Sequence, residues 1–350
     1  MRPVDQHLLA KQLKLSRTTV SRSLSNHPAI SAETRSRVQA LAAQLGYRSA
    51  PTRAVRRPRD AKPITIGVLI GAPLVAADRA TFPTILRGIR HRAAIEHAAV
   101  DVVSIDPAEF TPAAAQKHIF RLIRSAQWRG AILIYPLAEP VIRALSDKIS
   151  IVSALTEYAD ARIDVVDTDH HGVVSAVERL IKLGHRKIGF LSWHYPVGGV
   201  WAQRRFGAYA EALHQQGRSI DPKYVLNIRS AADRILSPAE LADFVAISAR
   251  RDGVTGWVCA ADHQAYQLIS DLRGRGLRVP EDVSVTGFDG NEPPPGLPAL
   301  TTLRVPNEQV GESAVAQLIS RLLYPRSVRR KILIETSLVI GSSTAAAPKR

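Results

Sequence analysis

Residues 15–26 read LSRTTVSRSLSN, and this stretch decides the fold of the first part of the chain. Ser16 is a good helix N-cap. Val20 and Leu24 stand four residues apart, so a short helix that follows Ser16 would bury only one narrow apolar stripe. Its other side chains are polar or cationic. The stretch therefore predicts a helix that packs against a small core and exposes arginines and hydroxyls.

Two more helices are predicted around this one. Apolar side chains recur at helical spacing from Asp5 to Gln12. A third helical run starts at Ser31 and ends before Gly46, a residue suited to a left-handed C-cap. Because a tight break separates the first two helices, the pattern predicts an all-α helix-turn-helix headpiece over residues 1–46.

The charge of the chain is unevenly distributed. The 350 residues include 47 Lys and Arg against 31 Asp and Glu, a formal net charge of +16. Residues 1–62 hold 13 basic and 3 acidic residues, a net charge of +10, and the remaining residues carry only +6. A basic headpiece on a nearly balanced body is typical of a module that binds a polyanion. A basic surface that merely meets water is the alternative.

The second predicted helix carries side chains of the kinds that suit contacts with DNA. Arg17 and Arg22 present guanidinium forks suited to guanine edges, while Thr18 and Ser21 present hydroxyls suited to phosphates or other base edges. The amides at the start of the helix also favour a phosphate. The pattern favours a recognition helix in the major groove over a surface helix whose polar face only meets solvent.

Together with ISAETR at residues 30–35 and LGYR at residues 45–48, the opening stretch resembles the headpiece of the LacI/GalR family of bacterial transcription regulators. One departure is Lys14, which stands where the family has glycine in the turn. In a left-handed conformation, lysine there would cost about 1 kcal/mol. The resemblance implies DNA contacts at Ser16, Arg17, Thr18, Thr19, Ser21, Arg22 and Asn26.

We interpret residues 47–62 as a basic hinge linker. In the resembling family a short hinge helix wedges a leucine into the minor groove, but this linker contains no leucine. Val55 is the nearest apolar wedge. Arg56 and Arg57 suit phosphates or a narrow groove. A solvated basic linker without DNA contacts is the alternative.

From residue 63 onward, short β-branched runs alternate with amphipathic helices, which indicates βαβ units and parallel sheets. About 280 residues exceed one comfortable open sheet, so we expect two α/β lobes. The runs that we interpret as strands are Ile64–Ile70, Val100–Ile105, Ala131–Ile134, Ile149–Ser153, Ile163–Val166, Lys187–Leu191, Gly256–Ala260 and Val283–Thr286.

The family resemblance also covers this body, through LGHRKIGF at residues 183–190, GLRVPEDVSVTGFD at residues 276–289 and LTTLR at residues 300–304. It implies a two-lobed, periplasmic-binding-protein-like (type I) domain in which the chain crosses between the lobes three times. The crossings are expected near Ile163, Val305 and Arg330. The resulting assignment is a domain over 63–340, with a first lobe at 63–163 and 305–329, a second lobe at 164–304 and 330–340, and a small-residue tail at 341–350.

The resemblance implies a small-molecule effector between the lobes. It matches Asp289 to a carboxylate that takes hydroxyl or amine groups, and Arg205 to an arginine that ties the ligand to the second lobe. Arg204 is the alternative if the register is off by one. Trp193 lies among His194, Tyr195 and Trp201, whose ring faces suit a sugar or a nucleobase, or else pack at the hinge. The expected effector residues are Phe82, Asp169, Trp193, Arg205, Asp262 and Asp289.

The sequence gives weaker support to a metal site, a reactive cysteine or an enzyme with a nucleotide cofactor. Asp167, Asp169, His170 and His171 are metal-ligand types, but adjacent residues at a strand end point in different directions, so we expect no metal. Cys259 has apolar neighbours, which favours a buried structural thiol. The sequence has no glycine-rich phosphate loop and no Gly-x-Ser-x-Gly motif, so an enzyme with a nucleotide cofactor is a weaker hypothesis and no cofactor is expected.

The sequence therefore predicts a homodimeric DNA-binding regulator that acts as a repressor on a pseudo-palindromic operator in double-stranded DNA and is controlled by a sugar-like or nucleobase-like effector. No signal-type apolar core and no apolar run of spanning length occurs in the sequence, so we expect a cytoplasmic protein without a membrane partner. A solute-binding protein and an α/β enzyme remain the alternative functions.

Overall fold

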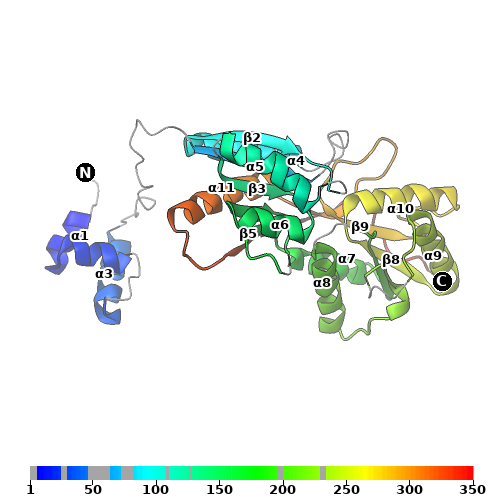
Figure 1. The fold of residues 1–350 in the computed structure, drawn as a ribbon. Coiled ribbons are helices and arrows are strands. Elements are labelled where there is room, and N and C mark those ends of the chain that lie inside the picture. The colour runs from blue at the N-terminus through cyan, green and yellow to red at the C-terminus, as the bar shows by residue number, and fades with distance from the viewer. Residues whose placement is uncertain are drawn as a thin grey trace. The chain divides into compact units, whose positions relative to one another are not determined.

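The computed structural model (Figure 1) describes residues 6–24, 30–45, 64–71, 82–107, 110–125, 128–158, 160–195, 200–228 and 234–349. The chain divides into two compact units, residues 1–62 and 63–350. Within the described ranges, no helix is both long enough and apolar enough to cross a membrane.

The first unit contains the three predicted helices. They are α1 (Gln6–Leu13), α2 (Arg17–Leu24) and α3 (Ala32–Gln44). Leu9, Val20 and Val38, one from each helix, are fully buried and meet in one small core. The Ser16 hydroxyl accepts the Thr19 amide at 3.0 Å, which confirms the predicted N-cap of α2.

The turn between α1 and α2 uses a left-handed backbone. Lys14 has φ +53°, and the amide of Leu15 donates to the carbonyl of Ala10 at 3.0 Å. The chain therefore keeps the turn geometry that glycine favours and accepts the conformational cost of a side chain at that position.

In the second unit, a six-stranded sheet forms the first lobe in the order β11-β5-β4-β3-β1-β2, and all its neighbouring strands are parallel. Along β1, odd and even residues face opposite sides, so one run of β-branched residues supplies two cores. Its strands are β1 (Ile64–Ile70), β2 (Ala98–Ser104), β3 (Trp128–Ile134), β4 (Ser150–Ala154), β5 (Asp164–Thr168) and β11 (Lys331–Ile334).

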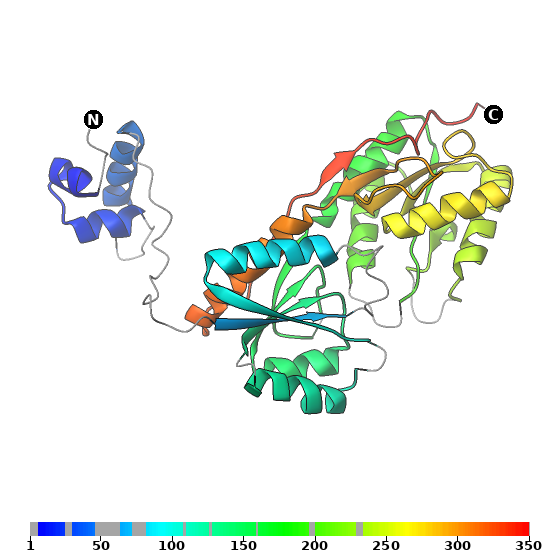
Figure 2. The same cartoon turned by 90° about the horizontal axis from the view of Figure 1, so that it is seen from above.

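Helices cover both faces of the first sheet (Figure 2). On one face, α4 and α11 approach so closely that a Cβ at Gly88 would collide with the backbone of Glu308, and one at Gly311 with that of Ile85. On the other face, α5 and α6 bury a separate cluster around Leu133. The four helices are α4 (Phe82–Ile95), α5 (Pro112–Ser125), α6 (Glu139–Ser146) and α11 (Asn307–Leu323).

The second lobe repeats this plan with the strand order β12-β10-β9-β8-β6-β7, in which only β12 is antiparallel to its neighbour among the described strands. Helices α7 and α8 cover one face, and α9 and α10 the other. The elements are α7 (Val173–Lys182), β6 (Lys187–Leu191), α8 (Trp201–Gln215), β7 (Val225–Leu226), α9 (Pro238–Arg251), β8 (Val254–Cys259), α10 (Asp262–Gly274), β9 (Ser284–Asp289), β10 (Thr301–Arg304) and β12 (Ser337–Val339).

Two expected lobe boundaries are wrong. The chain leaves the first sheet after Thr168 and Ile334, not near Ile163 and Arg330, while the other crossing follows Arg304. The reason is that both misplaced segments are strands whose backbones pair inside the first sheet, β5 with β4 and β11 with β5. Residues 164–168 and 331–334 therefore belong to the first lobe, not to the second as we expected.

The small-residue segment after residue 340 is not a free tail. Ser343 is fully buried, its hydroxyl donates to the carbonyl of Val285 at 2.6 Å, and it accepts the amide of Thr301 at 2.9 Å. The amide of Ala347 donates to the carbonyl of Leu183 at 2.8 Å. Small side chains let this segment lie close against the second sheet, so residues 341–349 belong to the second lobe.

A buried ion pair fixes the outer end of the first lobe. Two nitrogens of Arg321 on α11 donate to the carboxylate of Asp164 at 2.7 and 2.8 Å, and the Asp164 side chain is 1 % exposed. Arg321 also donates to the carbonyls of Pro325, Ser327 and Val328. One guanidinium thus holds both the start of β5 and the loop that leads to β11.

Asp164→Asn should lower the free energy of unfolding by about 3 kcal/mol, because it removes one partner of a buried pair. Burial acts to raise the pKa of Asp164, but hydrogen bonds from Arg321 and the Arg330 amide lower it below its ordinary value of 3.8 overall. This stabilisation is therefore present above pH 3.8 and is lost as the pH falls through the folded-state pKa. Urea unfolding measures the effect, and the exposed Asp160→Asn is the control; equal stabilities would contradict the assignment.

Lys14→Gly should stabilise the first unit by up to about 1 kcal/mol, since glycine adopts the left-handed backbone without a Cβ clash. Amide hydrogen exchange of the full chain measures it, and protection in α1 and α2 should rise by up to about fivefold. The control Lys11→Gly replaces a residue inside α1 and should lower protection instead. Unchanged or lower protection in Lys14→Gly would refute the strain.

Candidate functional site

The exposed side of α2 carries the first candidate site. Arg17, Thr18, Ser21 and Arg22 are all exposed, and their spacing places them on one side of the helix, opposite the buried Val20. The structure thus brings together four of the residues that the sequence assigned to DNA contact.

The other predicted DNA contacts have different positions. Ser16 and Thr19 bond one another through their hydroxyls at 2.8 Å at the start of α2, where they close the helix end. A capping hydroxyl lies beside the amides that favour a phosphate. The remaining predicted contacts, namely Asn26, Val55, Arg56 and Arg57, lie outside the described residues.

The second candidate site lies at the C-terminal ends of the parallel strands of the second sheet. The chain crosses between lobes at the end of β10, and the parallel register places the ends of β8 and β9 at the same edge. Strand ends at this edge are where open α/β sheets bind ligands. The side chains gathered there are called the strand-end cluster: Trp193, Tyr195, Trp201, Arg205, His263, Gln264 and Asp289.

Arg205 on α8 is the centre of the strand-end cluster. It is 7 % exposed, and one of its nitrogens donates to the carbonyl of Ala260 at 2.5 Å. Another nitrogen lies 3.6 Å from the Asp289 carboxylate. The guanidinium carbon stands 3.5 Å from the centre of the Phe288 ring and 4.8 Å from that of Trp201. Stacking and pairing together hold this buried charge in place.

Asp289 offers an acceptor at the end of β9. Its φ of +137° is unusual for a residue with a side chain, and it is followed by Gly290 at φ +79°. Burial raises the pKa of Asp289 to about 7, despite the nearby charge of Arg205. Unlike the other carboxylates around Arg205, Asp289 keeps part of its side chain exposed, at 19 %. A hydroxyl or amine donor can therefore reach it.

Asp262 follows the end of β8, as expected, but its side chain is bonded within the second lobe. It is fully buried, one oxygen accepts the Thr302 hydroxyl at 2.6 Å, and the other accepts the Asn291 amide at 2.7 Å. Burial raises the pKa of Asp262. Both oxygens are therefore used inside the second lobe, where they hold the loop that follows Asp289.

A chain of hydrogen bonds joins the strand-end cluster to the first crossing. Arg205 donates to Nδ1 of His170 at 3.4 Å, and Nε2 of His170 lies 3.3 Å from the Asp167 carboxylate at the end of β5. His170 therefore lies between the guanidinium of Arg205 and the carboxylate of Asp167. Burial acts to raise the pKa of Asp167, but its bonds to His170 and to the Thr168 amide lower it overall. Sequence analysis treated His170 only as a possible metal ligand.

Aromatic rings surround the arginine. Tyr195 packs against Trp201 with ring centres 5.7 Å apart, and Trp193 meets His263 edge to face at 5.1 Å. The Tyr195 hydroxyl lies 2.6 Å from Nε2 of His263 and accepts from Gln264 at 3.1 Å. His263 and Gln264 were missed by sequence analysis, although they lie in the first turn of α10, shortly after the end of β8, and so occupy a position that the strand-end rule covers.

Among the described residues, no side-chain hydrogen bond, ion pair or ring contact joins Asp169, Phe82 or Arg204 to the strand-end cluster. The Asp169 carboxylate caps a short turn by accepting the His171 amide at 3.0 Å. Phe82 packs edge to face on Tyr135 in the first lobe. Arg204 is exposed and pairs with Glu157. Arg205 rather than Arg204 therefore faces the strand ends.

The described residues contain no group of three or more His, Cys, Asp or Glu side chains arranged to hold a metal. His170 bonds Asp167, while His171 pairs with Glu211. The prediction for Cys259 is confirmed: it is 1 % exposed, and burial raises the pKa of its thiol, which disfavours the reactive thiolate.

Two family models match the chain. Residues 9–49 match bacterial regulatory proteins of the lacI family, and residues 177–344 match a periplasmic binding protein-like domain. The lactose operon repressor of Escherichia coli K12 is 26 % identical over 359 aligned positions, covering 99 % of this chain and 92 % of that protein. The transcriptional repressor CytR of the same strain is 27 % identical, covering 97 % of this chain and 96 % of its own.

Solved structures share the fold over nearly the whole length. A lac repressor dimer bound to operator and the anti-inducer ONPF is 25 % identical, with a TM-score of 0.64, covering 99 % of this chain and 100 % of that one. The regulator CelR in complex with cellobiose has a TM-score of 0.66 at 20 % identity, covering 97 % and 99 % of the two chains. At this identity, the similarity to CelR shows only that the two chains share a fold.

Proposed function

Because the chain belongs to the LacI family of DNA-binding transcription regulators, with its headpiece and effector-binding domain, we propose that it acts as a homodimeric repressor. It binds a two-fold symmetric operator through α2, and a small molecule held at the strand-end cluster sets its affinity for DNA. The observation that carries this proposal is the pairing of an exposed recognition face on α2 with a buried arginine at the strand ends, in one chain.

The DNA-binding part rests on the chemistry of α2. Arg17 and Arg22 supply bidentate donors for guanine, and Thr18 and Ser21 supply hydroxyls for bases or phosphates. One such helix reads only a few base pairs, so two copies related by a two-fold axis supply the specificity of an operator. The lac repressor relative supports this arrangement as a dimer bound to operator.

The effector part rests on the strand-end cluster. Asp289 offers a carboxylate to hydroxyl or amine groups, and the buried Gln264 side chain has an oxygen without a hydrogen-bond partner among the described residues. The rings of Trp193, Tyr195 and Trp201 offer faces to the C–H surface of a sugar or to a nucleobase. We propose a sugar-like or nucleobase-like effector in contact with these groups and Arg205.

The proposed role is binding, not catalysis. The named relatives are transcription regulators, and Arg205 and Asp289 are held by protein groups in the way that suits ligand recognition. A regulator that binds DNA acts where DNA is, so we propose a cytoplasmic location. Hydrogen bonds run from Arg205 through His170 to Asp167. Through them, ligand binding at Arg205 can affect the first crossing between the lobes.

Selection from random duplex DNA with the purified full-length protein tests the proposed function. A motif with two-fold symmetry would support a dimeric sequence reader, and recovery of DNA without a motif would contradict it. On the selected operator, Arg22→Ala should cost about 1 to 3 kcal/mol and relax the preference at one position in each half-site. Arg37→Ala removes the same charge from α3 and should weaken all sequences alike, if at all. A loss in Arg22→Ala that is equal for all sequences would contradict base reading.

Effector affinity should fall as the pH is lowered through about 7, by at most about tenfold per pH unit, because the ionised Asp289 accepts from the ligand and the protonated form does not. Calorimetric titration at pH 6 and pH 8, with a ligand found by thermal-shift screening, measures the change. Asp289→Asn should abolish this dependence. Asp271→Asn on α10 is the control and should preserve it, and a wild-type affinity independent of pH would contradict the assignment.

A further inference from the structure

The outer edge of the first lobe gathers cations from distant parts of the sequence. In a parallel sheet the starts of all strands lie at one edge, and the pairing places the starts of β3, β4, β5 and β11 along the edge at which β1 begins. Just before or within these starts stand exposed basic residues, here called the basal cations: Arg129, Lys148, Arg162, Arg326, Arg329 and Arg330.

The basal cations are not consumed by internal ion pairs. Within the described ranges, their side chains take part in no salt bridge, and the exposed acids near them in sequence at these strand starts are Asp147 and Asp160. Asp164, which also lies at this edge, is committed to Arg321. Among the described residues, the edge therefore keeps a surplus of positive charge that faces solvent.

Hydrogen bonds hold the backbone of the loop at this edge. Arg321 holds the carbonyls of residues 325, 327 and 328, and the amide of Arg330 donates to Asp164 at 2.7 Å. This fixes the backbone of the loop that carries Arg329. Arg162 and Arg329 line one cavity together with the hydroxyl residues Ser146 and Ser327. Two guanidinium groups beside hydroxyls form an arrangement suited to phosphate oxygens.

We propose that the basal cations contact the phosphate backbone of the same duplex that α2 reads, so that the first lobe itself contributes to DNA binding. Three observations carry this: the surplus charge, the fixed loop that presents it, and its place at the edge where the basic residues 47–62 join β1. Charge complementarity and continuity along the chain with the headpiece favour DNA as the partner. The inference rests on the proposed function.

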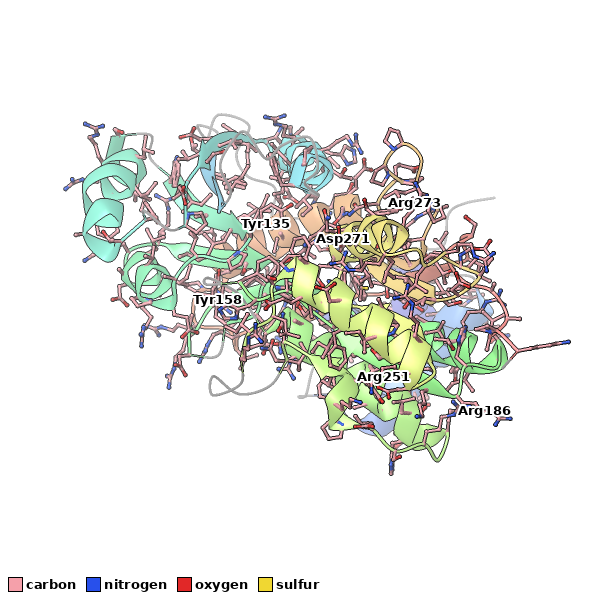
Figure 3. The ribbon with its side chains drawn as sticks, turned by 90° about the vertical axis from the view of Figure 1, so that its right-hand side faces the viewer. Tyr135, Tyr158, Arg186, Arg251, Asp271 and Arg273 are labelled. Carbon is pink, nitrogen blue, oxygen red and sulfur yellow. The ribbon has the colours of Figure 1, made fainter. Side chains whose placement is uncertain are left out.

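Salt titration of operator binding by the full-length protein tests this contact. The double variant Arg162→Gln with Arg329→Gln removes two basal cations per subunit. The matched control, Arg186→Gln with Arg251→Gln, removes two exposed arginines near the strand starts of the second sheet, both on the second lobe (Figure 3). All four side chains are exposed, so both variants should fold, which thermal unfolding verifies.

In the basal variant, the slope of log affinity against log salt should become shallower by about 2 to 4. Each lost phosphate contact lowers the magnitude of this slope by about 0.9, and the double variant removes two cations from each subunit of the dimer. When salt is raised from 50 to 200 mM, a slope that is shallower by 2 means that the variant's loss of operator affinity is about 16-fold smaller than that of the wild type. The control should keep the wild-type slope. Equal slopes for the two variants, with selective binding by the wild type, would overturn the basal contact alone. Unselective binding by the wild type would overturn the proposed function and this inference with it.

Discussion

The burial of the Arg205 charge is the constraint on which the second lobe depends. A guanidinium cannot leave water without partners, so two strand ends are arranged to supply them: the carbonyl of Ala260 after β8, and the Phe288 ring and Asp289 carboxylate of β9. His170 extends the same bonding to the first crossing. A ligand that changes the surroundings of Arg205 therefore changes the surroundings of a residue bonded to the first crossing between the lobes.

The sequence was sufficient to predict the headpiece, because its signals are local. Ser16 as a cap and Val20 as a core residue follow from a few neighbouring residues. The sequence placed Lys14 in the turn but left its backbone conformation open, and the structure shows it to be left-handed. It was also sufficient for the alternation of strands and helices in the body. The lobe boundaries failed because β5 and β11 are assigned to a sheet by the partner strand they pair with, and a single sequence does not display that partner.

The strand-end cluster also divides into residues that the sequence predicted and residues whose role depends on distant partners. Arg205 and Asp289 were predicted and meet in the structure, whereas Asp262 was predicted to contact the effector and is instead enclosed by Thr302 and Asn291. Whether a carboxylate serves the ligand or the fold depends on which groups fill its lone pairs, and those groups come from residues about 30 to 40 positions away. The basal cations were invisible for the same reason, since only parallel pairing brings them to one edge.

The central claim is that one molecule couples ligand binding to operator binding, and linkage makes that claim measurable. The affinity of the effector should be determined by calorimetry with the free protein and with the protein saturated by its operator. Coupling predicts a change of about 5-fold to 150-fold, equal to the change that the effector causes in operator affinity. An effector affinity that is the same with and without operator would contradict the account.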